Sequence, residues 1–243
     1  MLLYEKDVRI VLVRPRNPLN IGAAARAMLN FGFRDLVVVA PHEPVWQESK
    51  AAVGAQAVLR QARVAPNLLS AVEDRTLVLG TSSFSRRQIP EQVISLEQLP
   101  AVFKKGRTQF RIAVVFGSEK TGLSNEDLSF CHWIVRIPTT DVCPSMNLGQ
   151  AVSVLCYQLK LLMSAQASSK KYPSAAVAPV GEIERVANEI EKLVMSIPQP
   201  RRSAVSTRKL RLRQMLLRWG MTSDEARIVL GILHDLSWQL HRE

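Results

Sequence analysis

The sequence is poor in the residues that form disulfides and metal sites. It contains three cysteines, Cys131, Cys143 and Cys156, and no two of them stand in a C-x-x-C arrangement. The histidines are scattered along the chain, and there is no H-E-x-x-H motif. These absences argue against a disulfide scaffold, and the sequence predicts no metal site. An odd number of cysteines without such spacing is typical of the reducing cytoplasm, where we expect this protein.

Long apolar runs and common nucleotide-binding motifs are missing as well. No uninterrupted apolar stretch is long enough to span a bilayer, so we expect no membrane partner. Charged residues near the start of the chain argue against a signal peptide. There is no G-x-G-x-x-G motif, and segment 117–126 is not a P-loop because Glu119, not glycine, precedes Lys120. Hydride transfer and P-loop chemistry therefore lack the residues that they require.

Acidic residues are scarce, and their scarcity is greatest near the C-terminus. The formal net charge is +11. Between Pro200 and Gly220 the chain has no Asp or Glu. The basic residues of this stretch are Arg201, Arg202, Arg208, Lys209, Arg211, Arg213 and Arg218. A solvated surface face is one interpretation, but a cationic stretch without carboxylates favours a polyanion, and we expect nucleic acid.

Apolar, β-branched segments alternate with helical patterns over the first two thirds of the chain. We expect strands at Val8–Val13 and at 36–40, 76–81, 111–116 and 134–137. This alternation predicts an α/β fold with a mostly parallel sheet. The loops 80–87, 117–122 and 138–147 follow three of these strands and are rich in Gly, Ser and Thr. If their strands are parallel neighbours, the loops form a binding site at one edge of the sheet.

Two helices of this region carry the most information. Asn20 is the expected N-cap of a helix over 21–31, and Gly32 is its expected stop. The small residues 22–25 would let another backbone or a phosphate come close. A second helix, capped by Ser145 or Asn147, is so apolar that we expect it to be buried in a core or against a partner. An alanine-rich helix is expected over 47–61.

A composition change divides the chain into residues 1–165, a linker over 166–180 and a helical extension over 181–243. The extension should contain helices at 182–195, 206–218 and 223–240, the last with a Thr222–Glu225 capping box. In the middle helix the apolar residues should face inward and the arginines outward. The residues expected to pack inward are Leu212, Met215, Leu216 and Trp219. The last helix has an apolar stripe of Ile228, Val229, Ile232, Leu233 and Leu236. The extension would grip RNA, or alternatively brace a dimer.

Three segments together resemble the three motifs of the SpoU/TrmH branch of the SPOUT RNA methyltransferases. They are 20–28 (NIGAAARAM), 116–124 (FGSEKTGLS) and 145–148 (SMNL) with the helix that follows. Gly80, Thr81 and Ser82, with the basic C-terminal region, are similar to the TrmJ-like subgroup. Leu19 stands where many relatives have glycine and Phe84 where arginine is frequent, which puts RNA contacts at Phe84 in question.

The resemblance implies a deep trefoil knot, a homodimer and S-adenosylmethionine as the cofactor. It further implies methyl transfer to a ribose 2′-hydroxyl in the anticodon loop of tRNA, at cytidine or uridine 32. Methylation of rRNA and RNA binding without catalysis remain alternatives. The implied cofactor-binding residues are Thr81, Ser82, Ser83, Gly117, Gly122, Ile137, Ser145, Met146 and Asn147. The implied catalytic residues are Arg26, Ser145 and Asn147. The expected RNA-binding residues are Asn20, Arg86, Arg87, Glu119, Arg208 and Arg211.

The role of Arg26 follows from the chemistry of the nucleophile. A ribose hydroxyl is hardly ionised at neutral pH, and an arginine guanidinium does not give up its proton readily in proteins. We therefore expect Arg26 to act as an electrostatic clamp on a phosphate and on the developing alkoxide, not as a base. Glu119 would position Arg26 or the RNA, or only brace its own loop.

Overall fold

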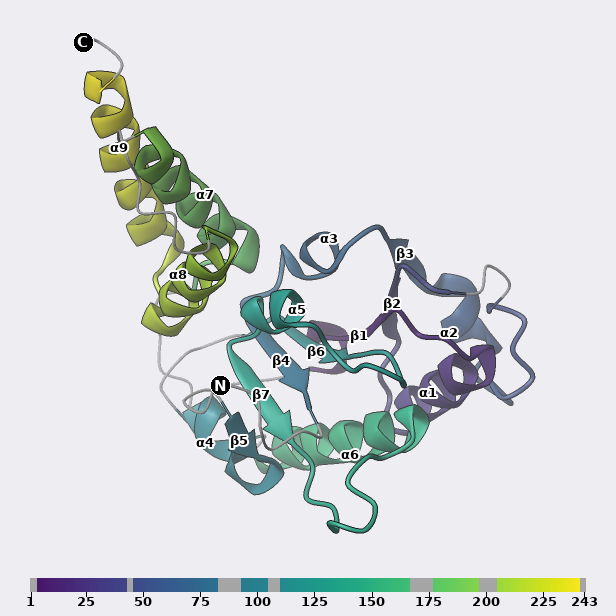
Figure 1. The fold of residues 1–243 in the computed structure, drawn as a ribbon. Coiled ribbons are helices and arrows are strands. Elements are labelled where there is room, and N and C mark those ends of the chain that lie inside the picture. The colour runs from purple at the N-terminus through teal and green to yellow at the C-terminus, as the bar shows by residue number, and fades with distance from the viewer. Residues whose placement is uncertain are drawn as a thin grey trace.

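The computed structural model describes residues 4–42, 46–82, 93–104, 110–166, 177–196 and 205–240. Its centre is a parallel sheet in the order β3-β2-β1-β6-β4-β7-β5 (Figure 1). The strands are β1 Val8–Val13, β2 Asp35–Val39, β3 Arg63–Ala65, β4 Leu77–Thr81, β5 Val93–Ser95, β6 Ile112–Phe116 and β7 Trp133–Arg136. The α/β class and the five expected strands are confirmed. The sequence missed β3 and β5, which are edge strands too short to show a repeating pattern.

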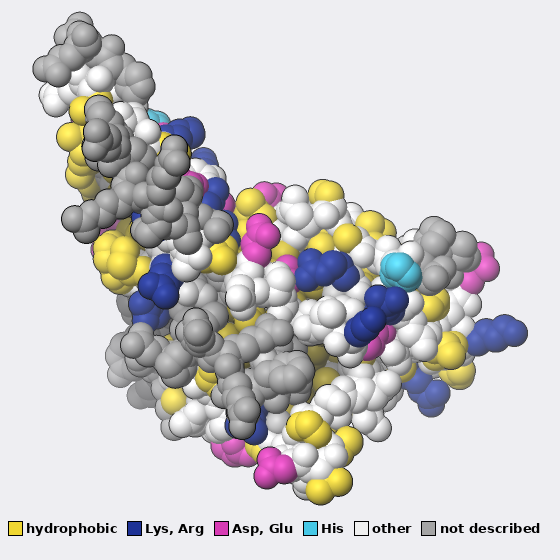
Figure 2. All heavy atoms as spheres, viewed as in Figure 1, with side chains coloured by type: hydrophobic (Ala, Val, Ile, Leu, Met, Phe, Trp, Pro, Cys, Tyr) yellow, Lys and Arg dark blue, Asp and Glu magenta, His cyan; other side chains and the backbone are white. Residues whose placement is uncertain are grey.

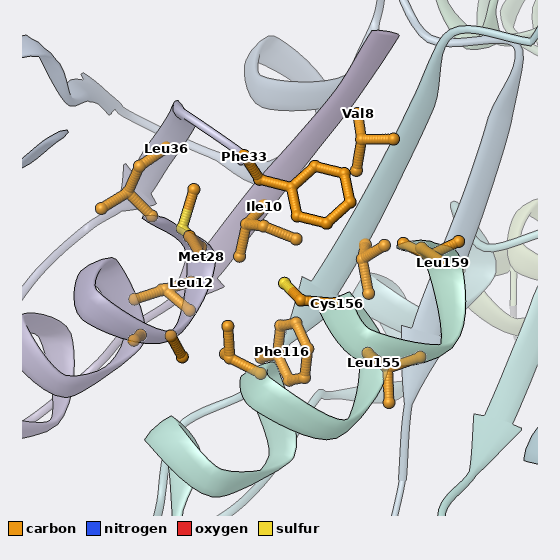
Figure 3. Packing of buried hydrophobic residues seen from close by; sticks show 14 of the residues in the cluster. Val8, Ile10, Leu12, Met28, Phe33, Leu36, Phe116, Leu155, Cys156 and Leu159 are labelled. Atoms are coloured by element: carbon orange, nitrogen blue, oxygen red, sulfur yellow. The ribbon is translucent and has the colours of Figure 1, made fainter. Parts of the chain in front are cut away.

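Both faces of the sheet are covered by helices, so its central strands are apolar throughout. Every residue of β1 and of β6 is buried. Val8, Ile10 and Leu12 point to one face, where they pack against α1 Pro18–Asn30 and α6 Leu148–Gln166 (Figure 3). Val11 and Val13 point to the other face, because successive side chains of a strand alternate.

The opposite face is covered largely by helices of the second half of the chain. Apolar residues of α5 Asn125–Ser129, α7 Val180–Ser196 and α8 Val205–Trp219 belong to the same buried cluster as Val11 and Val13. The remaining helices are α2 Gln56–Gln61, α3 Leu68–Val72, α4 Leu99–Lys104 and α9 Ser223–Leu240. Two short 3-10 helices lie at Glu5–Asp7 and Leu96–Gln98. None of the helices in the described part of the chain has the length and apolarity that a membrane crossing requires.

Two expected helices of the first half have different bounds. Helix α1 begins at Pro18, and its N-cap is Asn17, whose side chain accepts a hydrogen bond from the Leu19 amide at 2.9 Å. The prediction of Asn20 as the cap was therefore wrong, because Pro at the first helical position pre-sets the helix three residues earlier. Gly32 does end the helix, with φ of 87°.

The second of these helices, α2, starts only at Gln56. Residues 47–55, which were expected to be helical, form turns instead. Gly54 has φ of 77°, a left-handed conformation that interrupts a helix.

The C-terminal helices extend from the body as an arm (Figure 1). Their expected positions are confirmed, as is the capping box, in which the Thr222 amide donates to Glu225 at 2.7 Å and the Glu225 amide to Thr222 at 3.2 Å. Most of the expected linker, residues 167–176, lies outside the described residues.

The inward and outward faces of α8 were only partly predicted. Leu216 is buried and Leu212 and Met215 are half-buried, but the side chain of Trp219 is 62% exposed. Arg213, expected to face outward, is 3% exposed. The apolar stripe of α9 is also divided: Val229 and Leu233 pack against the core, whereas the remaining members are exposed. Those exposed members are Ile228, Ile232 and Leu236.

Arg213 turns inward because it has partners there. Its guanidinium forms an ion pair with Glu184 of α7, donates to the Ser129 hydroxyl of α5, and lies over the Phe130 ring at 3.8 Å from the centroid. A buried arginine that binds two other segments fixes the arm to the body. A buried charge without its partner is strongly unfavourable.

We expect Arg213→Ala to lower the free energy of unfolding by about 3–5 kcal/mol, because Glu184 would remain buried as an unpaired charge. Urea unfolding of the full-length protein measures this change. Arg211→Ala, which removes an exposed arginine from the same helix, is the matched control and should change stability by less than about 0.5 kcal/mol. Equal stability of the two variants would contradict a structural role for Arg213.

Candidate functional site

A cavity of about 430 Å³ opens at the carboxyl ends of β6, β4 and β7, which are parallel neighbours. The predicted crowding of three loops at one edge of the sheet is thereby confirmed for their described residues, which for the first loop are 80–82. The predicted residues that line it are Asn20, Thr81, Ser82, Gly117, Glu119, Gly122, Ile137, Ser145, Met146 and Asn147. Ser83, Phe84, Arg86 and Arg87 lie outside the described residues.

The floor of the cavity is a tight turn that only glycine permits. Ser118 and Gly122 form an antiparallel bridge, in which the Gly122 amide donates to the Ser118 carbonyl at 2.8 Å. A Cβ atom on Gly117 would stand 2.2 Å from the Gly122 carbonyl carbon, well inside contact distance. The two glycines therefore bracket the turn, and Ser124 caps the following helix α5.

The β4 loop is held by the sheet around it. The Thr81 hydroxyl donates to the Val115 carbonyl at 3.1 Å, and the Ser82 amide donates to the Val135 carbonyl at 3.4 Å. The Thr81 oxygen therefore offers lone pairs, and not its proton, to a ligand. Gly80 must remain small, since a Cβ atom there would lie 2.7 Å from the Cys131 sulfur.

The Glu119 carboxylate joins the β6 loop to the start of α1. It accepts hydrogen bonds from the backbone amides of Arg16 at 2.9 Å and Asn17 at 3.2 Å, and from the Asn20 side chain at 2.9 Å. Burial raises the pKa of Glu119, but these hydrogen bonds outweigh burial and leave the pKa below its usual value. The carboxylate is thus ionised at neutral pH.

The same network continues into the third loop through Asn20. Its side-chain oxygen accepts from the Asn147 side-chain amide at 3.0 Å. The Asn147 oxygen in turn accepts from the Gly149 amide at 2.9 Å and so caps α6. Between the two candidate caps, Ser145 and Asn147, the structure selects Asn147. Glu119, Asn20 and Asn147 therefore form one chain of hydrogen bonds across the cavity rim, which we call the rim network.

Small residues let α1 and α6 meet beside this network. A Cβ atom on Gly149 would lie 2.7 Å from the Cβ of Ala23. One on Gly22 would lie 2.4 Å from the Ser49 hydroxyl. The low side-chain bulk at the start of α1 thus serves close packing, the first of the two uses that the sequence suggested.

Arg26 is not part of the cavity wall. It is exposed on α1, and within the described residues no hydrogen bond or ion pair holds it. Among the described residues, the cation that lines the cavity is Lys120, next to Glu119 in the 117–122 turn. Sequence reasoning missed Lys120 after the P-loop was excluded, although its position beside Glu119 was the available signal. Arg208 and Arg211 lie on α8, in the arm.

Burial disfavours the thiolate form of the two cysteines in the core, Cys131 and Cys156. Burial raises the pKa of the Cys156 thiol to about 12, and burial together with the charge of Asp127 raises the pKa of Cys131 further above its usual range. Among the described residues no group of His, Cys, Asp and Glu could hold a metal ion. The described residues that line the cavity offer amides, hydroxyls and the charges of Glu119 and Lys120.

Gly117→Ala should distort the 117–122 turn and lower the free energy of unfolding by about 3 kcal/mol, since the new methyl group meets backbone that cannot move aside. Gly231→Ala is the matched control. Gly231 lies in α9, and no atom of the described residues comes within 4 Å of the place that an added methyl group would take, so alanine should stabilise the helix by up to about 1 kcal/mol. Urea unfolding distinguishes the two. A neutral Gly117→Ala would contradict the turn geometry.

Known proteins share the sequence pattern of this chain. Residues 7–157 match the model of the SpoU rRNA Methylase family. The tRNA (cytidine/uridine-2′-O-)-methyltransferase TrmJ of Sodalis glossinidius is 32% identical over 95% of this chain and 91% of its own length. The tRNA (cytidine/uridine/adenosine-2′-O-)-methyltransferase TrmJ of Pseudomonas aeruginosa is 33% identical over 94% of this chain and 93% of its own.

Solved structures agree with the sequence relatives. The crystal structure of TrmJ from Z. mobilis ZM4 superposes with a TM-score of 0.78 at 33% identity, covering 94% of this chain and 98% of that one. A probable methylase family protein from Haemophilus influenzae gives a TM-score of 0.64 at 28% identity, covering 98% and 99%. The match of the family model over the whole sheet and all three cavity loops shows that this chain belongs to the SpoU methylase family.

Proposed function

We propose that this protein transfers a methyl group from S-adenosylmethionine to a ribose 2′-hydroxyl of tRNA, at a cytidine or uridine. The observation that carries the proposal is the cavity at the ends of three parallel strands, with the rim network along its edge. The relatives that match this chain over almost their whole length are named as tRNA 2′-O-methyltransferases, which supports tRNA as the substrate. Nucleotide 32 of the anticodon loop is the target that we propose within tRNA.

The cavity suits the proposed cofactor in size and in lining. Its wall combines apolar side chains such as Ile137 and Leu148 with the small polar groups of Thr81 and Ser82. Gly117 and Gly122 line the cavity without side chains, so a ligand can approach the backbone of the turn closely. S-adenosylmethionine supplies an electrophilic methyl group, so the protein has to orient the substrate and stabilise charge. In this proposal Thr81, Ser82, Gly117, Gly122, Ile137 and Met146 hold the cofactor, and Ser83 would join them. The proposed chain path around this site is a trefoil knot.

Ser145 and Asn147 are the groups proposed to hold the ribose hydroxyl. Ser145 is exposed at the cavity rim and its hydroxyl is available. The Asn147 side chain uses one N–H on Asn20 and one oxygen lone pair on Gly149, which leaves one of each for the substrate. Because the rim network fixes the amide, Asn147 presents these groups without reorganising.

We assign Arg26 to the RNA side of the reaction. Its exposure and its place outside the cavity wall suit contact with a phosphate next to the target ribose better than contact with the cofactor. A fixed positive charge there would stabilise the alkoxide that develops as the hydroxyl loses its proton. The side chains of Asn20 and Glu119 are hydrogen-bonded to each other, and in this proposal they hold Asn147 and the start of α1 in place. Their proposed contact with RNA is at the cavity rim.

A homodimer through α6 is part of the proposal. Tyr157 and Leu161 on α6 are 53% and 46% exposed, although the rest of the helix is largely apolar and packed. Tyr157 meets the Phe31 ring edge-on at 6.0 Å. Exposed aromatic and leucine side chains on an otherwise buried helix are typical of a subunit interface.

Incubation with labelled S-adenosylmethionine and either total tRNA or total rRNA tests the activity. We expect label in tRNA, mapped as a 2′-O-methyl group, and loss of about 10²–10³-fold in rate for Arg26→Ala with cofactor affinity unchanged. Arg26→Lys should keep part of the activity, because a point charge retains some of the electrostatic stabilisation. Label in rRNA alone would assign the other substrate of the family, and RNA binding without cofactor binding would exclude catalysis.

The C-terminal arm, residues 181–243, is proposed to bind tRNA and to carry out no chemistry. Arg208 and Arg211 lie on the basic helix α8, away from the cavity, and no acidic side chain in the described residues pairs with either. Arg86 and Arg87, which follow the β4 loop in sequence, are proposed as further RNA contacts near the cavity.

Reversing both charges, in Arg208→Glu/Arg211→Glu, should weaken tRNA binding and reduce the slope of log affinity against log salt by about 1–2, because fewer counterions are released. The control Lys50→Glu/Arg60→Glu makes the same charge change at exposed positions beside and on α2, on the other side of the sheet from the arm (Figure 1). Anisotropy titrations at several salt concentrations measure the slopes. Equal salt slopes for the two variants would contradict tRNA binding by the arm and leave it only a structural role.

A further inference from the structure

The exposed side of α8 combines an aromatic ring with basic side chains. Trp219 is 62% exposed, and within the described residues its indole has no ring or cation partner. Arg211 and Arg218 are exposed on the same helix, seven residues apart and therefore on one face. Figure 2 shows hydrophobic and basic side chains next to one another in the region of α8.

The basic residues of α8 differ in what they contact. Arg213 is paired with Glu184, and Lys209 is paired with Glu191 at 3.0 Å, so both belong to the packing of α8 on α7. Arg211 is exposed and lies outside this packing. Arg211, about two turns before Trp219, therefore keeps a positive charge that the packing on α7 does not use.

The nearest acids along the chain are engaged at the start of α9. Asp224 pairs with Arg227 at 2.7 Å, and Glu225 accepts from the Thr222 amide at 2.7 Å in the capping box. Helix α8 itself contains no acidic residue. An anion that approaches the exposed side of α8 thus meets the Arg211 guanidinium and an open aromatic ring.

We propose that Trp219 is a stacking site for an unpaired base of RNA, with Arg211 at a flanking phosphate. Bases of single-stranded loops can turn outward and stack on an aromatic side chain, whereas bases in a duplex are already stacked on each other. Every base has a flat face, so the contact selects loops over helices without selecting sequence. The inference rests on the proposed RNA substrate and adds a contact that distinguishes loop from duplex RNA.

A phosphate contact and a stacking contact respond differently to salt. Charge contacts release counterions and weaken steeply as salt rises. Stacking involves no counterion, so its loss lowers affinity by the same factor at every salt concentration. Salt titration therefore separates Trp219 from the arginines beside it.

The experiment uses the full-length protein and two RNA probes: an anticodon stem–loop, and a duplex of the same length without unpaired bases. Trp219→Ala should weaken binding of the stem–loop on the order of 10–100-fold, with an unchanged salt slope and unchanged binding of the duplex. Trp219→Phe should retain most of the affinity, because it keeps an aromatic face.

Trp238→Ala is the matched control. Trp238 on α9 is 57% exposed, close to the value for Trp219, but stands three residues after Asp235, whereas the helix of Trp219 contains no acidic residue. It should bind both probes like the unchanged protein. Circular dichroism and cofactor binding verify that each variant is folded.

Equal losses for the two RNA probes would overturn the stacking site, as would a Trp219→Phe variant that binds as weakly as Trp219→Ala. A change of oligomeric state in Trp219→Ala would overturn it too, because it would assign the ring to a subunit contact. If the unchanged protein methylates tRNA while Trp219→Ala binds normally, only this inference fails. If the unchanged protein binds neither probe, the proposed function fails with it.

Discussion

The ionised carboxylate of Glu119 is the constraint on which the geometry of the site depends. The sheet brings three loops to one edge, but parallel strands alone leave the loops free to adopt independent conformations. Glu119 binds two backbone amides before α1 and the Asn20 side chain, which then binds Asn147. A negative charge beside a helix N-terminus is further stabilised by the helix dipole. One side chain thus coordinates the turn after β6, the start of α1 and the cap of α6.

Buried arginines play the corresponding role in the frame around the site. Arg9 of β1 binds Asp35 of β2 at 2.9 Å and Asp74 at 2.7 Å, and it also donates to the Ala71 carbonyl of α3. Arg213 does the same between α8, α7 and α5. Part of the positive charge in the sequence therefore holds the chain together, and only the remainder is available to a polyanion. The proposed RNA surface is therefore limited to the faces that carry cations without an internal ion pair.

The sequence predicted which loops form the site but not the hydrogen bonds that connect them. The motif segments identified the loops, and Gly117, Asn147 and Gly32 act as their residue types predict. Asn20 was expected to cap a helix, whereas its side chain joins two loops, and its contact with RNA stays a prediction. Helix caps are set by backbone dihedral angles, and Asn17 followed by Pro18 satisfies them one turn earlier. Bonds between residues about a hundred positions apart, such as Asn20 to Glu119, leave no local pattern in a sequence.

The sequence by itself determined the apolar central strands, the glycines of the turns, the α/β class and the three C-terminal helices. Each of these follows from local chemistry: side-chain alternation, the conformational freedom of glycine, and capping by Thr222 and Glu225. Only the tertiary structure decided which cations are used internally and which face solvent. Periodicity places Arg213 and Trp219 on a helix but cannot say which face meets the body, because that depends on where Glu184 and Ser129 lie. Arg213 is buried because Glu184 and Ser129 lie on that side of α8, and Trp219 is left exposed to solvent.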